Sequence, residues 1–377
     1  MDPYEVYSRY DVTVVSGLDV YVYDDEGRRY LDFYGGHAVI SIGHSHPHYI
    51  RRLTNQLSKL GFYSNSVKMP LQEELSQKLG QLSGYEDYSL FLCNSGAESN
   101  ENAFKLASFH TSRSRIIVFE NGFHGRTSLA VAATDSAKLI APINATSNII
   151  RLPFGDMESV EKNLDESVAA ICIEGIQGIA GIYEPEPEFL AALSAACKKN
   201  GSLLILDEIQ SGYGRTGRFF AHQYSPHCHP DIITVAKGMG NGFPIGGVLI
   251  HPSIKPVLGR LGTTFGGNHL ACAAGLSVLE VIENEQLLPH TAVVGDYLLT
   301  QLKQVSGIKE IRGKGLMIGI SVDQPAAEIR KKLLFEHSIF TGSASDPHTV
   351  RLLPPLTATR KHADHLVSSL KQVLTHE

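Results

Sequence analysis

The chain has 377 residues, of which 43% are hydrophobic and 19% are charged, and these values are ordinary for a globular protein. At roughly 150 residues per domain, this length predicts two or three domains. The net charge of -6 does not indicate the basic face that nucleic acid binding requires, and no apolar run approaches the roughly 18 residues that span a bilayer. Five scattered cysteines without a CxxC pair, and a start without a signal-peptide pattern, predict a cytoplasmic protein with reduced cysteines.

The N-terminal part of the chain predicts a hairpin followed by two helices. Residues 20–23 and 29–33 alternate apolar and polar side chains around the acidic, glycine-ending turn 24–27, which is typical of a hairpin. Amphipathic patterns then predict helices over 47–60 and 70–82, each beginning with a proline, which suits the first turn of a helix.

From about residue 88 the chain alternates between apolar strands and helices. A helix is predicted over 97–109, and an Ala- and Leu-rich helix over 187–200 ends at an Asn-Gly pair. Such alternation predicts α/β layers around a mostly parallel sheet. The predicted strands of this sheet are 88–92, 115–119, 169–173, 203–206, 232–236 and 245–250.

After about residue 268 the pattern changes. A long helix over 268–285 leads to a second helix, and strands are predicted over 317–322 and 349–353. We expect a smaller α+β domain here, completed by the N-terminal hairpin. The predicted organisation is therefore an N-terminal segment 1–45 that joins the small domain, a large domain 46–262, and a linking helix with the small domain over 263–377.

Two of the predicted strands end in charged residues. The apolar run 202–206 stops at Asp207, and the run 232–236 stops at Lys237. Both are typical of strands buried on both faces of a parallel sheet, and ligands bind at the carboxyl edge of such a sheet. Pyridoxal phosphate requires a lysine for a Schiff base and an acid beside its pyridinium nitrogen, so this pair suits it. A structural ion pair is the alternative interpretation.

Two further segments have the composition of anion sites. The small residues Ser95, Gly96 and Ala97 open a predicted helix after a strand, and exposed N–H groups at such a turn favour a phosphate. The loop 262–268, rich in glycine and threonine, precedes another helix and has free hydroxyl and N–H groups. The alternative interpretations are an ordinary helix cap and an ordinary turn.

Other motifs are weaker. Phe123 follows a strand and could stack on a ring, and Arg126 could clamp a carboxylate, although a surface loop with a solvated arginine explains both. The glycine-rich run 238–242 leads into a strand rather than a helix, which argues against a dinucleotide site. The histidines around positions 46 and 228 lack zinc-type spacing, so we predict no metal site.

Six motifs occur in a fixed order along the chain, namely CNSGAESNENAFKLA, FHGRT, LLILDEIQSGYGRTGRFFA, PDIITVAKGMGNGFPIGG, GTTFGGNHLACAAG and RLLPPLT. Together they resemble one known family, the subgroup III aminotransferases that use pyridoxal phosphate. The resemblance extends from about Tyr21 to Leu356 and implies a fold-type I homodimer with active sites at the subunit interface.

The resemblance implies roles for the residues that hold the cofactor. Lys237 would be the Schiff-base lysine, Asp207 would pair with the pyridinium nitrogen, and Gln210 would contact the ring oxygen. Phe123 would stack on the ring. Ser95, Gly96 and Ala97 would bind the phosphate, together with Thr264 from the partner subunit.

The resemblance also implies the substrates. Within the family the motifs are most similar to those of enzymes that transfer the δ-amino group of an N-acylornithine, most simply N-acetylornithine, to 2-oxoglutarate in arginine biosynthesis. Arg126 would bind the α-carboxylate of acylornithine and the distal carboxylate of 2-oxoglutarate, and Arg351 the α-carboxylate of glutamate. N-succinylornithine, ornithine and 4-aminobutyrate remain alternative donors.

The chain departs from the family pattern in the segment 174–181. Gly175 stands where proline is usual, and Ile179 stands where the family has an acid that commonly pairs with the arginine at position 351. Because an unpaired buried arginine is costly, we expect another group or water to cover Arg351. An aminomutase or decarboxylase is the alternative reaction class, and Arg351 argues against both because neither needs a glutamate clamp. A non-catalytic binding protein is disfavoured by the intact Lys237 and Asp207.

Overall fold

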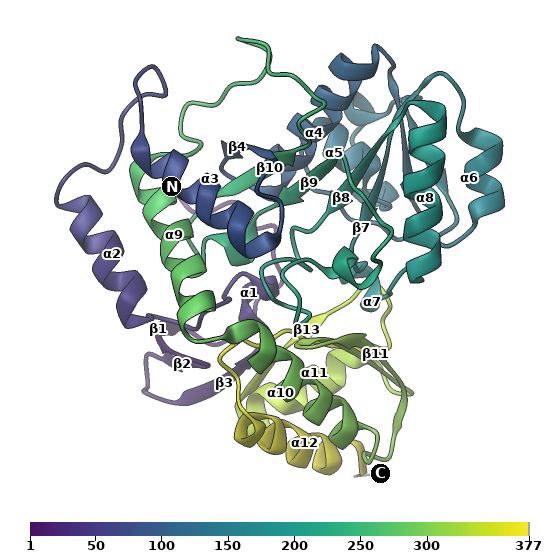
Figure 1. Cartoon of the computed structure of the whole chain (residues 1–377). Coiled ribbons are helices and arrows are strands. Elements are labelled where there is room, and N and C mark those ends of the chain that lie inside the picture. Colours follow the sequence, from purple (N-terminus) through teal and green to yellow (C-terminus); the bar gives the residue numbers. More distant parts are fainter. Residues whose placement is uncertain (376–377) are drawn as a thin grey trace.

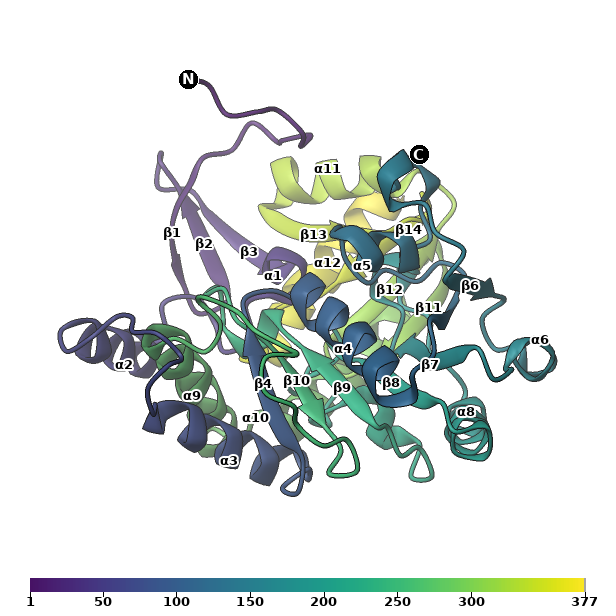
Figure 2. The same cartoon turned by 90° about the horizontal axis from the view of Figure 1, so that it is seen from above.

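The computed structural model describes residues 1–375, and these residues form two seven-stranded sheets with helices packed against them (Figure 1). The larger body holds a sheet of order β4-β10-β9-β8-β7-β5-β6, and the smaller body holds a sheet of order β1-β2-β3-β13-β14-β12-β11. Seen from above, the short turn α1 (Gly35–Ala38) lies between β3 of the smaller sheet and the start of α4 of the larger body (Figure 2). No helix of residues 1–375 is both long and apolar enough to cross a membrane.

The larger sheet is parallel except for β10, which runs antiparallel to both β4 and β9. The predicted mostly parallel sheet is therefore confirmed. Its strands are β4 (Ser89–Cys93), β5 (Arg115–Phe119), β6 (Ile149–Leu152), β7 (Val168–Glu174), β8 (Leu203–Asp207), β9 (Ile232–Val235) and β10 (Gly246–Ile250).

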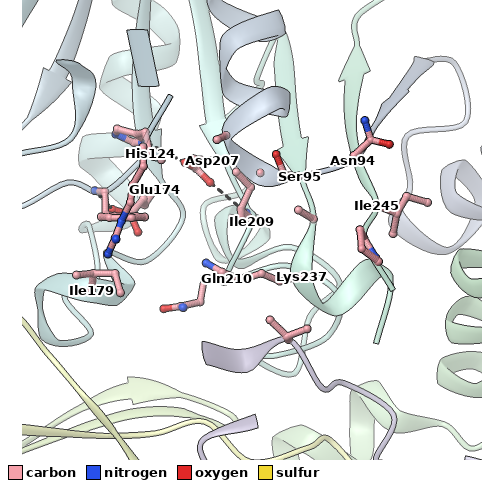
Figure 3. Close-up of a pocket in the computed structure, with 18 of the residues that line it drawn as sticks. Asn94, Ser95, His124, Glu174, Ile179, Asp207, Ile209, Gln210, Lys237 and Ile245 are labelled. Atoms are coloured by element: carbon pink, nitrogen blue, oxygen red, sulfur yellow. Dashed lines mark hydrogen bonds and ion pairs between the residues drawn. The ribbon is translucent and has the colours of Figure 1, made fainter. Parts of the chain in front are cut away.

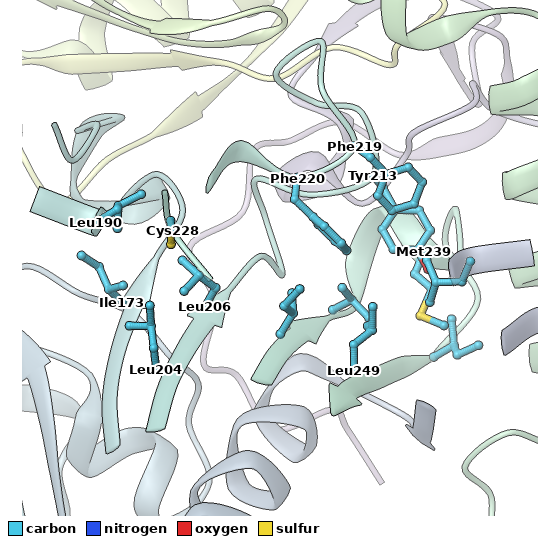
Figure 4. Close-up of a cluster of buried hydrophobic side chains, with 14 of the residues drawn as sticks. Ile173, Leu190, Leu204, Leu206, Tyr213, Phe219, Phe220, Cys228, Met239 and Leu249 are labelled. Atoms are coloured by element: carbon cyan, nitrogen blue, oxygen red, sulfur yellow. The ribbon is translucent and has the colours of Figure 1, made fainter. Parts of the chain in front are cut away.

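Alternate residues of β8 face the two layers that cover this sheet. Leu204 and Leu206 belong to the core cluster that includes Leu190 of α8 (Pro187–Asn200) (Figure 4). Leu203 and Ile205 belong to the opposite cluster, which also contains side chains of α4 (Gly96–Thr111). A strand with both faces covered must be apolar at every position, and this explains the continuous apolar run in the sequence.

Other helices complete the larger body. A second group packs together, because α2 (Pro47–Leu57) and α3 (Pro70–Ser83) both contact the long helix α9 (His269–Asn284). The shorter helices are α5 (Ser128–Ala133), α6 (Met157–Asn163) and α7 (Gly178–Gly181), with 3-10 turns at Ala137–Leu139, Pro142–Asn144, Ala221–Tyr224 and Lys237–Met239.

The smaller sheet joins the two ends of the chain. Strand β3 pairs in parallel with β13, so the N-terminal hairpin and the C-terminal segment share one sheet. The domain boundaries at residues 45 and 262 stay a prediction. The elements are β1 (Val14–Leu18), β2 (Tyr21–Asp24), β3 (Arg29–Phe33), β11 (Ile308–Lys314), β12 (Met317–Val322), β13 (Ile339–Ser343), β14 (Thr349–Leu352), α10 (Leu287–Leu302), α11 (Ala326–His337) and α12 (Arg360–Thr375).

A strained turn follows β3. In α1 the φ angles of Gly35, Gly36, His37 and Ala38 are 55°, 56°, 66° and 63°, so four successive residues are left-handed. His37 and Ala38 are not glycine, and a side chain in this region costs backbone energy that the surroundings must offset. Strain of this kind often marks a functional site, and Gly36 and His37 do line a cavity.

Gly295 of α10 lies where this helix packs closely on the smaller sheet, and its substitution tests that packing. A Cβ at Gly295 would lie within 2.4 Å of the backbone of Gly315, which joins β11 to β12. Because a backbone contact cannot rotate away, we expect Gly295→Ala to destabilise the protein by about 1–3 kcal/mol and to lower its melting temperature.

Gly275 of α9 is the matched control. A Cβ there would meet the ends of two side chains, Leu75 at 3.1 and 3.4 Å and Ile245 at 3.6 Å, which can shift, and no backbone atom this close. Alanine in a helix is favoured over glycine by about 1 kcal/mol, so Gly275→Ala should melt at or above the wild-type temperature. Equal melting temperatures for the two variants would contradict the close packing of α10.

Candidate active site

The ends of β8 and β9 lie side by side at one cavity. The two strands are parallel neighbours, with Asp207 opposite Thr234, and Lys237 follows β9 by two residues. Asp207 and Lys237 both line a cavity of about 420 Å³ (Figure 3). The carboxyl edge of the parallel sheet is thus hollowed where these two charged side chains lie.

Lys237 is held in an unusual backbone conformation. Its φ is 47°, and the preceding Ala236 has φ -169° and ψ -148°. Two hydrogen bonds to Ser41 hold this turn in place. Ser41 Oγ donates to the carbonyl of Gly238, and the Asn241 side chain accepts from the N–H of Ser41. A left-handed lysine persists only where its surroundings determine it, so the fold positions this amine.

Burial lowers the pKa of Lys237 below its ordinary value, because the ammonium loses its water. The carboxylates of Asp207 and Glu174 act in the opposite direction, and Arg351 adds to the lowering. A lowered pKa increases the fraction of neutral amine at a given pH. Lys237 is therefore a better nucleophile and base than an exposed lysine.

Asp207 is buried as a hydrogen-bond acceptor. Its Oδ2 accepts from His124 Nδ1 at 2.7 Å and from Asn100 Nδ2 at 2.8 Å, and its Oδ1 accepts from the N–H of Ile209 at 3.1 Å. Burial alone would lower the pKa of His124, but Cys172 and the Asp207 carboxylate raise it well above its usual value. The arrangement favours a carboxylate beside an imidazolium, ready to pair with a cationic ring nitrogen.

The N-terminus of α4 forms another wall of this cavity. Ser95 is the N-cap, and its Oγ accepts from the N–H of Glu98 at 3.2 Å. The N–H groups of Gly96 and Ala97 have no intrahelical acceptor at this position of a helix, and both residues line the cavity. A Cβ at Gly96 would lie 2.8 Å from Ile209, so only glycine fits. The geometry suits an anion.

The loop after β5 closes the cavity on a further side. Gly125 has φ 137°, and a Cβ there would lie 2.8 Å from the Cβ of Ala97, so the loop packs tightly on the start of α4. Phe123 and Arg126 line the cavity from this loop. Phe123 is fixed by its N–H, which donates to Glu174 Oε1 at 2.9 Å.

A second cavity of about 650 Å³ adjoins the first and shares Phe123, Arg126, Gln210 and Lys237 with it. Arg351 of β14 and Lys138 also line it, so four cationic side chains and the carboxylate of Asp135 reach one space. Burial and the charges of Arg351, Lys237 and Arg126 lower the pKa of His37 in this cavity to about 4. The imidazole is therefore neutral at pH 7, and the cavity favours anions.

Arg351 is fully buried and carries no carboxylate partner within residues 1–375. Its Nε donates to the carbonyl of Ser343, and one terminal nitrogen donates to the carbonyl of Gly178 at 3.2 Å and to Gln210 Oε1 at 3.0 Å. The other terminal nitrogen has no hydrogen-bond partner. A guanidinium with unused donors beside a cavity is suited to bind a carboxylate.

The structure gathers the predicted site residues with one exception. The first cavity is lined by Ser95, Gly96, Ala97, Phe123, Arg126, Asp207, Gln210 and Lys237, and Arg351 lines the second. Thr264 lines neither cavity and is exposed. Gln210 bonds to Arg351 and, through Nε2, to the carbonyl of His37, so its contact with a ring oxygen stays a prediction.

Sequence reasoning missed three residues that support Asp207 and Phe123, namely His124, Asn100 and Glu174. Glu174 accepts from the N–H groups of Phe123 and Gly178, and burial, with the charge of Asp207, raises its pKa to about 7. His124 could have been suspected from its place beside Phe123. Asn100 lies one helical turn after Gly96, but nothing local indicates that it reaches the end of β8.

Comparison of the sequence with known proteins identifies aminotransferases as its relatives. A model of the class-III aminotransferase family matches residues 5–374. An acetylornithine aminotransferase of Archaeoglobus fulgidus is 40% identical over 366 residues, which cover 96% of each chain. One of Bacillus subtilis is 39% identical and covers 99% of this chain and 97% of its own.

Solved structures agree with these relatives. An acetylornithine aminotransferase from Elizabethkingia anophelis is 32% identical with a TM-score of 0.84, over 98% of this chain and 95% of its own. An ornithine aminotransferase from Toxoplasma gondii, with partial occupancy of PLP at its active site, is 29% identical with a TM-score of 0.90, over 98% and 92%. On this sequence and structural similarity, the chain belongs to the class-III aminotransferase family.

Proposed function

We propose that this protein is an acylornithine aminotransferase. It would move the δ-amino group of an N-acylornithine, most simply N-acetylornithine, to 2-oxoglutarate, giving the acylglutamate semialdehyde and glutamate within arginine biosynthesis. The main observation is that the cavity of Lys237 and Asp207 adjoins a second cavity, with Arg126 lining both and Arg351 lining the second. The acetylornithine aminotransferases among its relatives support the choice of donor.

The residues of the first cavity fit pyridoxal phosphate. Lys237 would bond covalently to its aldehyde carbon, the Asp207 carboxylate would face the ring nitrogen, and Phe123 would stack on the ring. The free N–H groups of Gly96 and Ala97 would hold the phosphate. When bound, the cofactor supplies an electron sink that stabilises negative charge on the substrate carbon.

Lys237 would also move the proton. Its neutral amine would take the proton from the substrate carbon and return it to a second carbon. The lowered pKa favours this role, because the amine must be neutral to act as a base. His124 and Asn100 would orient Asp207 without touching the substrate.

Two arginines would bind the carboxylates of the substrates. Arg126 lines both cavities and would bind the α-carboxylate of the acylornithine and the distal carboxylate of 2-oxoglutarate. Arg351 would bind the other carboxylate of 2-oxoglutarate and of glutamate. A planar guanidinium binds a carboxylate through two parallel hydrogen bonds, which fixes the position of the reacting carbon.

The pKa of Lys237 gives a testable pH dependence. Cofactor-free enzyme should capture pyridoxal phosphate at a rate that rises with pH as the ammonium loses its proton. Because burial disfavours the ammonium, the midpoint of this rise should lie below 10.5, the ordinary lysine value. Stopped-flow visible absorbance measures the rate. The Asp207 charge raises this pKa, so Asp207→Asn should shift the midpoint to lower pH.

Two controls accompany this measurement. Lys237→Ala should show no covalent capture after borohydride reduction and mass spectrometry. The same reaction with Nα-acetyllysine in solution corrects for the titration of the cofactor itself. A midpoint at or above 10.5 contradicts the buried-amine argument.

A donor panel tests the proposed substrate. Acetylornithine, succinylornithine, ornithine and 4-aminobutyrate are each supplied with 2-oxoglutarate, and kcat/KM is measured from glutamate formation. We expect an N-acylornithine to give the highest value, since acylation removes a cationic group from a donor that must enter a cationic cavity. Preference for free ornithine or 4-aminobutyrate would overturn the assignment.

We also propose a homodimer with shared active sites in the cytoplasm. Phe62, Tyr63, Leu258 and Phe265 are exposed apolar side chains, and the rings of Phe62 and Phe265 lie 5.5 Å apart. Such an apolar surface favours a protein partner, and a second copy would bring its Thr264 to the phosphate. The five free, buried cysteines suit a reducing compartment.

Phe265→Asp tests the dimer. A charge in this apolar surface should shift the enzyme toward monomer and lower its cofactor content, because Thr264 of the partner is lost. Sedimentation velocity and absorbance measure the two effects together. Ile143→Asp is the control, since Ile143 is 89% exposed in the 3-10 turn Pro142–Asn144. A wild-type enzyme that sediments as a monomer would refute the proposal.

A further inference from the structure

The Gln210 side chain bonds to two residues associated with the smaller sheet, although Gln210 itself follows a strand of the larger sheet. Its Oε1 accepts from Arg351 at 3.0 Å, and its Nε2 donates to the carbonyl of His37 at 3.1 Å. Both ends of the amide are therefore used, and both partners belong to elements joined to the smaller sheet. The same residue lines both cavities.

Gly178 makes room for this arrangement. A Cβ at Gly178 would lie 1.9 Å from Gln210 Oε1 and 2.8 Å from its Cδ, so no other residue permits the amide to lie here. The φ of Gly178 is not in the left-handed region, and the backbone itself does not demand glycine. Glycine is required at position 178 because the Gln210 amide occupies the space beside Arg351 that a side chain would fill.

The Gln210 amide that bonds to the Arg351 guanidinium is uncharged. Arg351 donates to two carbonyls and to this amide, and the neighbouring Ile179 is apolar. The nearby carboxylate of Glu174 is engaged by the N–H groups of Phe123 and Gly178. The hydrogen bonds of this fully buried arginine therefore go to dipoles, while the Glu174 carboxylate acts on its charge without bonding to it. A carboxylate that bonds directly to the guanidinium can displace such a dipole with a gain in electrostatic energy.

We propose that Gln210 is a neutral, displaceable cover of Arg351 that sets the specificity of the cavity. The amide stays on the guanidinium while an amine donor with a single carboxylate occupies Arg126, and it moves aside when the second carboxylate of a dicarboxylate enters. This inference rests on the proposed aminotransferase function and assigns Gln210 a role in distinguishing its two substrates.

The lack of negative charge on Gln210 affects which amino donor the cavity accepts. Because no carboxylate of residues 1–375 bonds to Arg351, a donor that carries an additional ammonium group enters a cavity that already holds two arginines. Free ornithine has such a group, and acylation removes it. A carboxylate in place of the amide would cancel one positive charge and make the cavity more tolerant of the free diamine.

Gln210→Glu tests the cover with a group of nearly the same shape. The probe is glutarate, a five-carbon dicarboxylate that lacks the reacting carbonyl, and its Kd is measured by titration of the cofactor-loaded enzyme. We expect the Kd to rise by about tenfold or more, because glutarate must displace a carboxylate from Arg351. The ratio of kcat/KM for ornithine over acetylornithine, measured in the amine half-reaction, should rise.

Two further variants complete the test. Gln81→Glu changes the net charge equally at an exposed position of α3, and its glutarate Kd should match that of the wild type. Gly178→Ala should push the amide off Arg351, so its glutarate Kd should fall below the wild-type value.

Two outcomes would overturn the proposal. One is an unchanged glutarate Kd in Gln210→Glu. The other is an equal loss of glutarate binding and of the acetylornithine half-reaction, which would mean that Gln210 serves only the cofactor. Failure of the proposed function is separate, because it would appear as a wild-type enzyme that does not act on any N-acylornithine.

Discussion

The structure of the site depends on the burial of one carboxylate, that of Asp207. The side chain is 3% exposed, so its charge must be met by hydrogen bonds. Asn100 supplies one and also donates to the carbonyl of His124, while it accepts from Thr234 at 2.8 Å. The network thus ties the ends of β8 and β9 to α4 and to the loop after β5. The cavity walls converge because they share this acceptor.

The charges of the two cavities follow from that arrangement. The buried carboxylates Glu174 and Asp207 end two strands of the larger sheet, whereas Arg126 lines both cavities and Arg351 lines the second. Lys237 lies at the boundary and lines both. A lysine there experiences burial and cationic neighbours from one direction and carboxylates from the other. Its lowered pKa is the balance of those effects, and catalysis by an amine near neutral pH needs that balance.

The sequence predicts the larger sheet well because its central strands are buried on both faces and must be apolar throughout. It misses β6, which has four residues at the sheet edge, and β11, whose edge position tolerates Lys309 and Glu310. It also misses β13, which pairs with β3 from about 300 residues away. For the site, Lys237 and Asp207 stand at strand ends that patterning can find. The roles of His124 and Asn100 arise from long-range contacts that no local pattern contains.

The second cavity forms where residues of the two sheets meet, and this explains why residues from both ends of the chain line it. The strained turn α1 follows β3, β3 pairs with β13, and Gly342 of β13 pairs with Arg351 of β14. His37 therefore follows one strand of the smaller sheet and Arg351 lies in another, whereas Gln210 follows β8 of the larger sheet. Because its amide bonds to both, a displacement of Gln210 breaks contacts between the two sheets and uncovers Arg351 in the same movement.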